Sequence, residues 1–480
     1  MIMKYIKYFF RTIAGLILIL LLTCIIAFIV DSYQTRYLNI TDENLLTENS
    51  YLIKDVNVIP MTKDTVVLHQ NVLIRDGKIE SISGDIPEID VTVIEGKGKF
   101  LSPGLIDAHV HVWDKQEFGL YLANGVTAVR NAWGMPFHLR FKKDTNHDKL
   151  LAPLFITTTP KLTGAQNAEF DQLGVKNAKH AEELLHHFHE QGYDLVKTYA
   201  GVPEDIFDAI LRESEKNDMP VVAHPSFEVP YEYHFKQAIQ SIEHTEDIVQ
   251  NALQYKLDSL ALQKVVQDYV DAKMAHTPTL TIYQNIIDII ENEELIKTTK
   301  GGEYMNPTLM SLGSVNDYNR WTSEQYYNPE TLANIKKQHR FHLYIVKQLH
   351  DSGVKLLCGT DAGIVFNQPG FAIHEELGYF IEAGLSPYEA LKTATVNPST
   401  EIKLFNESGT VEKGKIANLI LTDSNPLDNI SILKNPKAVF IKGRYLEADR
   451  LNEFKEKAKN RKTGLVTLLR FAESLIENYL

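Results

Sequence analysis

Residues 99–112, KFLSPGLIDAHVHV, are the stretch of the chain from which its fold class can be predicted. The segment is mostly apolar and ends in two histidines, His109 and His111. Side chains at positions i and i+2 of a strand point to the same side, so both imidazoles can reach one metal ion. A second such pair, His187 and His189, lies in a helical pattern, where positions i and i+2 diverge. The first pair therefore predicts a metal site at the end of a buried strand.

Further strand-like runs follow this segment and alternate with helical periodicity. They are GVTAVRNAW (125–133), APLFITTTP (152–160), YDLVKTYAG (193–201), PVVAHPS (220–226), QSIEHTE (240–246), MAHTPTL (274–280) and VKLLCGTDAG (354–363). Amphipathic stretches such as AKHAEELLHHFHEQG (178–192) lie between them. With the first strand they make eight alternating units, which is the pattern of a (β/α)₈ barrel. We expect this barrel over residues 105–404.

β-rich segments flank the predicted barrel on both sides. Residues 51–104 contain several short strand-like runs and a hairpin-type Asp76-Gly77, and residues 405–450 return to the same character. The two segments predict one composite β-sandwich domain assembled from both ends of the chain. Residues 451–480 have a helical pattern and are expected to form a C-terminal helical extension.

The composition excludes several classes of protein. Of the 480 residues, 44% are hydrophobic and 23% are charged, which excludes a wholly disordered chain and a collagen-like fibre. The 49 basic and 62 acidic residues give a net charge of −13, and with no long basic run we expect no nucleic-acid partner. The two cysteines exclude a disulfide framework and a cysteine-rich zinc site.

An apolar segment near the N-terminus predicts a membrane anchor. Residues 12–30 carry no charge, and as a helix they would be roughly 29 Å long, close to the thickness of a bilayer's hydrocarbon core. Lys4, Lys7 and Arg11 precede the segment, and Asp31 follows it. This distribution of charge favours a cytoplasmic N-terminus.

The expected topology is therefore a single-pass membrane protein. Residues 1–11 would be cytoplasmic, residues 12–30 would cross the membrane, residues 31–50 would form a stalk, and the rest of the chain would be extracytoplasmic. A cleaved signal peptide is the alternative, although no pair of small residues closes the apolar run.

Potential metal ligands recur where the predicted strands end. They are Lys197, His224, His244 and Asp361, in addition to His109 and His111. Each has an ordinary alternative, because a histidine can be held by backbone partners, an aspartate can cap a helix and a lysine can form a core salt bridge. All six, however, would meet at the carboxyl end of one barrel, where barrel enzymes have their active sites. A shared metal site is the stronger hypothesis.

With these residues in view, the chain resembles the amidohydrolase superfamily, in its imidazolonepropionase-like and prolidase-like branch. The matching words are PGLIDAHVH (103–111), GVT (125–127), VK (196–197), AH (223–224), IEH (242–244), GTD (359–361), SP (386–387), TAT (393–395), NP (397–398) and GKIANL (414–419). The resemblance covers roughly residues 50–445. It implies an α/β fold, a distorted (β/α)₈ barrel with a composite β-sandwich.

The resemblance also implies a ligand set and a mechanism. It assigns His109, His111 and Asp361 to a more buried metal ion, and His224 and His244 to a second. The implied cofactor is Zn²⁺, two ions per chain, with other divalent metals as substitutes. Hydroxide activated by zinc would attack the amide carbonyl, and Asp361 would pass a proton to the leaving nitrogen, as the catalytic acid–base.

Lys197 resembles a lysine that many members carry as an N6-carboxylated bridge between the two metals. A carbamate supplies two oxygen ligands and neutralises charge. Some mononuclear relatives use no carbamate, and a salt-bridged core lysine is the alternative here.

Three more side chains are candidates for contact with the substrate. Tyr199 shares a strand face with Lys197 and could touch a carbonyl oxygen, with aromatic packing as the alternative. Arg130 could bind a carboxylate or serve as a structural ion-pair partner, and His276 could line the pocket or be held in the barrel wall. The connection of about residues 285–340 is longer than a plain barrel loop needs, and its aromatic residues could shape the pocket or simply pack. These aromatic residues, with one just before the stretch, are Tyr283, Tyr304, Tyr318, Trp321, Tyr326 and Tyr327.

These observations predict a membrane-anchored, metal-dependent hydrolase of amide C–N bonds. A dipeptidase or Xaa-Pro-type carboxypeptidase is the leading subclass. A mononuclear deaminase or an imidazolonepropionase-like hydrolase of cyclic amides is the alternative within the fold, and a catalytically dead binding protein is the alternative of another class. The expected partners are a small amide or dipeptide substrate, the membrane and a second copy of the chain in a homo-oligomer.

Overall fold

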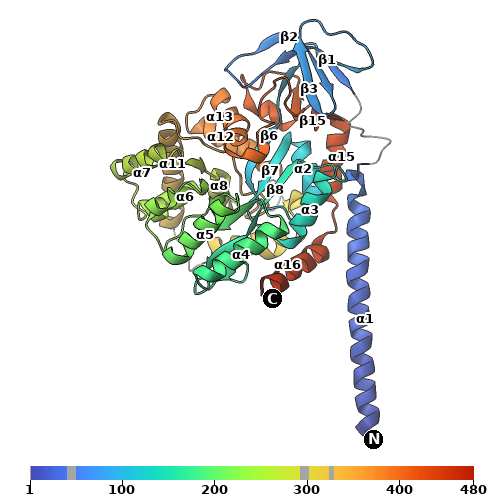
Figure 1. Cartoon of the computed structure of the whole chain (residues 1–480), viewed down its shortest axis with the longest axis vertical. Coiled ribbons are helices and arrows are strands. Elements are labelled where there is room, and N and C mark those ends of the chain that lie inside the picture. The colour runs from blue at the N-terminus through green and yellow to red at the C-terminus, as the bar shows by residue number, and fades with distance from the viewer. Residues whose placement is uncertain (1, 41–49, 292–301, 324–328, 480) are drawn as a thin grey trace.

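A computed structural model of the chain describes residues 2–40, 50–291, 302–323 and 329–479. Figure 1 shows three parts: a β-sheet at one end, a barrel surrounded by helices, and a long N-terminal helix that extends away from both. This helix, α1 (Ile2–Thr35), is almost entirely unburied along its apolar stretch and is long and apolar enough to cross a membrane. The α/β class and the barrel predicted from the sequence are confirmed.

The sheet at the end of the molecule is composite, as predicted. Its eight strands are β1 (Tyr51–Val58), β2 (Val67–Arg75), β3 (Lys78–Ser83), β4 (Thr92–Glu95), β5 (Phe100–Pro103), β14 (Leu419–Thr422), β15 (Ala438–Ile441) and β16 (Arg444–Glu447). Their order is β16-β15-β14-β5-β1-β2-β3, and β4 also pairs with β1. The two ends of the chain meet where β5 and β14 pair antiparallel, with Leu101 opposite Leu421. Because both leucines are buried, this seam also belongs to the apolar core of the sheet.

The barrel strands follow one another in chain order and are parallel. They are β6 (Leu105–Val110), β7 (Val126–Asn131), β8 (Leu154–Gly164), β10 (Leu195–Thr198), β11 (Val221–Ala223), β12 (Ile239–Glu243) and β13 (Ala275–Thr277), with β9 (Leu173–Val175) paired to β8. Most of their residues are buried on both faces, as continuous apolar strands of a barrel must be.

The predicted eighth strand is present as a short closing segment, residues 354–363, instead of a regular strand. Leu356 bridges to His276 of β13, and Ala362 bridges to Val110 of β6. The N–H of Ala108 donates to the carbonyl of Cys358 at 2.8 Å. The segment therefore joins the last strand to the first and closes the barrel.

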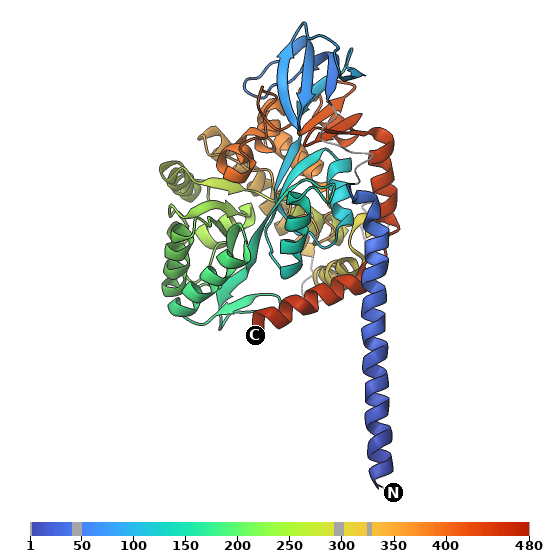
Figure 2. The same cartoon turned by 45° about the vertical axis from the view of Figure 1, so that its right-hand side comes forward.

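Helices cover the outside of the barrel (Figures 1 and 2). They are α2 (Gln116–Ala123), α3 (Pro136–Asn146), α4 (Ala178–Gln191), α5 (Glu204–Lys216), α6 (Thr245–Asp247), α7 (Ser259–Ala272), α8 (Leu280–Glu291), α10 (Val315–Thr322), α11 (Pro329–Asp351), α12 (Ala372–Glu382), α13 (Pro387–Thr393) and α14 (Val396–Glu401). Local signals fix their ends: Asn177 caps α4, and Ser386 and Glu389 form a capping box on α13.

The barrel has a defined orientation relative to the composite sheet. Strand β6 begins two residues after β5, so the amino ends of the barrel strands adjoin the sheet. A Cβ at Gly104, between the two strands, would lie 2.2 Å from the Thr127 side chain, so only glycine fits there. The carboxyl ends of the strands therefore face away from the sheet, toward the side from which α1 extends (Figure 2).

The C-terminal extension folds into two helices, α15 (Ala448–Lys459) and α16 (Gly464–Tyr479). α15 packs on α2, and α16 packs on α1 and α3. Arg461, in the link between the two helices, is buried. It lies 3.1 Å from Asp114 and 3.6 Å from Glu117, two residues that follow His111 closely in sequence. The extension thus supplies a positive charge to two buried carboxylates in the loop after β6. Without this partner, their burial would lower the stability of the fold.

Candidate active site

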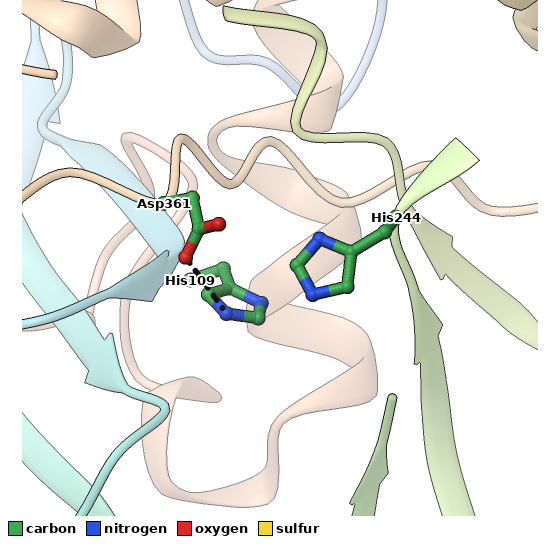
Figure 3. Close-up of side chains that lie close together, drawn as sticks. All are labelled: His109, His244 and Asp361. Carbon is green, nitrogen blue, oxygen red and sulfur yellow. Dashed lines mark ion pairs between the residues drawn. The ribbon is translucent and has the colours of Figure 1, made fainter. Parts of the chain in front are cut away.

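Three of the predicted ligands converge at the carboxyl end of the barrel (Figure 3). His109 comes from β6, His244 follows β12 and Asp361 lies in the closing segment, and one ligand atom from each lies within 4.8 Å of the others. The Nε2 atoms of His109 and His111 lie 3.3 Å and 2.6 Å from Oδ1 of Asp361. The predicted pair on β6 therefore faces one carboxylate.

The other two predicted ligands lie beside this group. The ring of His224, after β11, is 4.8 Å from the ring of His244, which is 4.9 Å from the ring of His109. Lys197, from β10, lines the same pocket as the four histidines and Asp361. The structure thus brings all six predicted ligands to one site.

The electrostatics of the histidines suit metal ligands. Burial lowers the pKa of His111 to about 4 and that of His244 to about 3, so both rings are neutral near pH 7, as metal binding requires. Burial alone would raise the pKa of Asp361, but His111 and His109 outweigh it and hold that pKa well below its usual range. The neutral rings of His111 and His244 therefore lie near an ionised carboxylate.

Several buried polar atoms of this site test whether a metal fits. Within the described part of the chain, Nζ of Lys197, Nδ1 of His111 and Nδ1 of His224 have no hydrogen-bond partner. Buried polar atoms ordinarily have one, so atoms of this chemistry clustered around a carboxylate fit a divalent cation. Lys197 is 1% exposed, and burial lowers its pKa to about 8, which makes its amine unusually available as a nucleophile. The chemistry of these residues fits a bound divalent metal ion.

A buried ion pair supports His109 from behind. Glu243 lies 2.5 Å from Nδ1 of His109, and its other oxygen accepts a hydrogen bond from Arg130 Nη2 at 3.0 Å. Burial would raise the pKa of Glu243, but Arg130 and His109 together hold it well below the usual range. The carboxylate therefore fixes the His109 ring with Nε2 toward Asp361, as carboxylates behind metal-bound histidines do.

Arg130 also bonds to the carbonyl of Ala108 and to Ser241, and it is fully buried. Replacing it by methionine is expected to lower the free energy of unfolding by about 3–5 kcal/mol, because Glu243 would be left charged and unpaired. Urea unfolding of the detergent-solubilised chain measures this. Arg140→Met is the matched control, since Arg140 pairs with Glu473 at an exposed position, where a salt bridge contributes less than about 1 kcal/mol. Equal effects of the two substitutions would contradict the structural role of Arg130.

The backbone at two of the ligands is strained. His244 has φ of 67° and Asp361 has φ of 59°, in the left-handed region that non-glycine residues rarely adopt. Strain of this kind is usual at functional sites, where the surrounding structure holds a side chain in a required direction. Here it turns both side chains into the site (Figure 3).

The site opens into a pocket of about 620 Å³. Beyond the ligands, polar and aromatic groups line it: Trp133, Lys161, Asp171, Tyr199, Glu246, Gln250, Tyr255, Tyr283, Asp317, Arg320, Trp321 and Gln338, with Ile282, Ile286, Ile364 and Val365. Two of the aromatic residues predicted to shape the pocket, Tyr283 and Trp321, do so. Tyr304 instead stacks on Phe371. Tyr326 and Tyr327 lie outside the described residues.

The three substrate candidates take different positions. Tyr199 lines the pocket, with its ring 4.5 Å from the ring of His224. Arg130 lies beneath the site in the ion pair already described, and not in the pocket wall. His276 is fully buried in the barrel wall, held by the hydroxyls of Thr245 at 2.9 Å and Tyr269 at 3.0 Å.

Sequence reasoning missed Lys161 and the supporting role of Glu243. Lys161 is buried near the end of β8, pairs with Asp171 at 2.5 Å and lies 3.8 Å from the centre of the Trp133 ring. The available signal was a lysine directly after the strand-like run at 152–160. Glu243 directly precedes His244 in the matching motif at 242–244. The motif alone, however, does not show that Glu243 pairs with Arg130 across the barrel.

Comparisons with known proteins identify the family and the fold. Residues 100–446 match the model of the Amidohydrolase family. A dihydroorotase of Carboxydothermus hydrogenoformans is 51% identical over 63 residues, which is 13% of this chain and 14% of the relative. The structure of a bottromycin amidohydrolase matches with a TM-score of 0.71 and 21% identity, covering 86% of this chain and 91% of that one. The structure of a Xaa-Pro dipeptidase with bound methionine matches with a TM-score of 0.63 and 18% identity, covering 83% and 100%.

Proposed function

Because the chain belongs to the amidohydrolase family, we propose that it is a metal-dependent hydrolase of amide C–N bonds. The observation that carries the proposal is the group of His109, His244 and Asp361, whose ligand atoms lie within 4.8 Å at the carboxyl end of the barrel. A metal-dead binding protein on this fold would have no need for three buried histidines, a fourth that is half-buried, an ionised aspartate and an unpaired lysine in one pocket.

The ligand set has two parts. His109, His111 and Asp361 would hold the more buried ion, and His224 and His244 a second one, with carboxylated Lys197 between them. A bound divalent ion, Zn²⁺ in our proposal, supplies Lewis-acid polarisation of the amide carbonyl and lowers the pKa of water.

The protein's own residues handle orientation and protons. Asp361 is ionised and faces the pocket, so it can accept a proton from the attacking water and give it to the leaving nitrogen. Glu243 keeps the His109 ring in one orientation while this happens. Tyr199 and Lys161 line the pocket beside the ligands and are placed to contact the substrate's polar groups.

For the substrate, we propose a small linear amide, in the first instance a dipeptide or Xaa-Pro-type peptide. The pocket volume of about 620 Å³ suits a molecule of that size. The barrel also resembles the Xaa-Pro dipeptidase structure along 83% of this chain. A cyclic amide is the second candidate, favoured by the 63-residue match to a dihydroorotase.

The same proposal includes a location. Helix α1 would anchor the enzyme in a membrane, with the basic residues Lys4, Lys7 and Arg11 in the cytoplasm and the barrel on the other side. The exposed apolar surface of α1 supports this, because such a surface is stable in lipid and not in water.

The test is a panel of amides assayed with the full chain, purified in detergent without chelator. The panel contains Xaa-Pro and other dipeptides, N-acyl amino acids, dihydroorotate and hydantoins. We expect hydrolysis of a linear amide that falls at least about 100-fold after metal removal and returns with Zn²⁺. Turnover of ring substrates alone would favour the second candidate. Activity that survives complete metal removal, or a chain that binds no metal, would overturn the proposal.

A further inference from the structure

Helix α16 lies beside the mouth of the barrel. Its Phe471 contacts Trp133, which follows β7 and lines the pocket, at a ring distance of 6.4 Å. Phe471 also contacts Phe170, from the loop after β8, at 6.1 Å. Since both partners follow the carboxyl ends of barrel strands, α16 covers the rim of the pocket and not the amino-end face of the barrel.

The outer face of α16 is apolar. Leu465, Leu468, Ala472 and Ile476 are spaced as one stripe of a helix, and all four are exposed. The exposed fractions of Leu465, Leu468 and Ile476 are 44%, 45% and 59%. An outward stripe of this kind is unusual on a helix that already packs on the barrel through its other face.

Phe170 extends this stripe toward the pocket. It is 72% exposed although it touches Phe471. We call Leu465, Leu468, Ala472, Ile476 and Phe170 the rim surface.

Helix α16, which carries most of the rim surface, also contacts the end of α1. Asp31, directly after the apolar segment, pairs with the buried Arg470 of α16 at 2.7 Å. Gln34 accepts a hydrogen bond from the N–H of Lys462 at 2.9 Å. From these contacts α1 extends past α16, away from the barrel. No other element of the described chain extends along this part of α1 (Figures 1 and 2). A membrane that held residues 12–30 would therefore lie next to α16.

We infer that the rim surface binds the surface of the bilayer that α1 crosses, so that the pocket opens toward the lipid headgroups. Apolar side chains on one face of a helix that lies along a membrane enter the boundary between headgroups and acyl chains. The enzyme would then meet amides that are bound to or released at the membrane before those in bulk solution. The inference rests on the proposed membrane span of α1.

A single-cysteine experiment on the full chain tests it. Cys24 is replaced by serine, and Cys358 is fully buried and does not react in the folded protein. Leu468→Cys is labelled with an environment-sensitive fluorophore, and the protein is reconstituted into phosphatidylcholine vesicles that contain nitroxide lipids with the spin label near the headgroup. We expect a blue-shifted emission and quenching by at least about half, as for a side chain in the membrane interface.

Two matched variants make the outcome decisive. Leu404→Cys reports on a leucine that is 56% exposed near the amino ends of the strands, next to the Lys403–Asp218 pair, and its label should stay unquenched. Ile17→Cys reports on the span itself and should be quenched by lipids that carry the nitroxide deep in the acyl chain. A quenched label at 17 with a water-exposed label at 468 would overturn the rim inference alone. No quenching at 17 would overturn the span and the rim inference together, and a blue-shifted but unquenched label at 468 would identify a second protein copy as the occupant.

Discussion

Asp361→Asn is expected to lower kcat for amide hydrolysis by about 10³-fold or more, since both proton transfer and a metal ligand are impaired. The asparagine amide cannot accept the proton from water, and it lacks the charge that faces His109 and His111. Its size matches that of aspartate, so the closing segment keeps its bridge to β6. Steady-state kinetics on the best substrate of the panel measure the loss of kcat, and circular dichroism shows whether the variant keeps its fold.

The control for Asp361→Asn is Asp423→Asn. Asp423 is exposed on the composite sheet, 3.8 Å from Lys437, so its charge is screened and distant from the pocket. This variant should keep full activity. We expect Asp361→Asn to retain about a thousandth of wild-type kcat. If it retained more than about a tenth, the proposed acid–base role of Asp361 would be wrong.

Lys197→Ala is expected to lower the bound metal from about two ions per chain to one or none, and kcat by about 100-fold or more. The buried amine of Lys197 has no hydrogen-bond partner in the described residues. The alanine cannot form a carbamate, so two ions in one pocket would lose the negative charge between them. Elemental analysis of chelator-free protein measures the stoichiometry.

Lys161→Ala is the matched control for metal content. Lys161 is also a buried lysine of this pocket, but its amine pairs with Asp171, so its loss should leave two ions bound. A short carboxylic acid added to Lys197→Ala should restore part of the metal and the activity, because it can occupy the space of the carbamate. Full metal content in Lys197→Ala without such an acid would contradict the bridging role and favour a mononuclear enzyme.

Much of the barrel, and the convergence of the six candidate ligands, could be predicted from sequence because the signals are local. A ligand at a strand end is marked by the apolar run before it, and His109, His224 and Asp361 each follow such a run. Parallel strands in a barrel then bring their carboxyl ends to one face, whatever lies between them in sequence. The composite sheet was predictable for a similar reason, since two β-rich segments that flank a barrel have each other as partners.

The remaining features depend on contacts between distant residues, which no local pattern encodes. The partner of Arg130 is Glu243, 113 positions away, so the sequence left a substrate role and a structural role open. The left-handed backbone at Asp361 and His244 is imposed by tertiary packing against the preference of both residues. The two helices of the C-terminal extension had a recognisable pattern, but their place beside the pocket follows from Arg461 and Arg470, which pair with residues 347 and 439 positions away.

The closing segment of the barrel has a consequence for biosynthesis. Asp107 on the first barrel strand accepts hydrogen bonds from Thr360, 253 positions later, so the segments that carry His109 and Asp361 are synthesised far apart in time. At a synthesis rate of about 5–20 residues per second, roughly 13–50 s separate them. During that interval strands β6 and β7 exist without the segment that completes their sheet, and the N-terminal helix has already left the ribosome. Asp361 can therefore join the other candidate ligands only after the chain has closed on itself, in whichever compartment the last third of the protein folds.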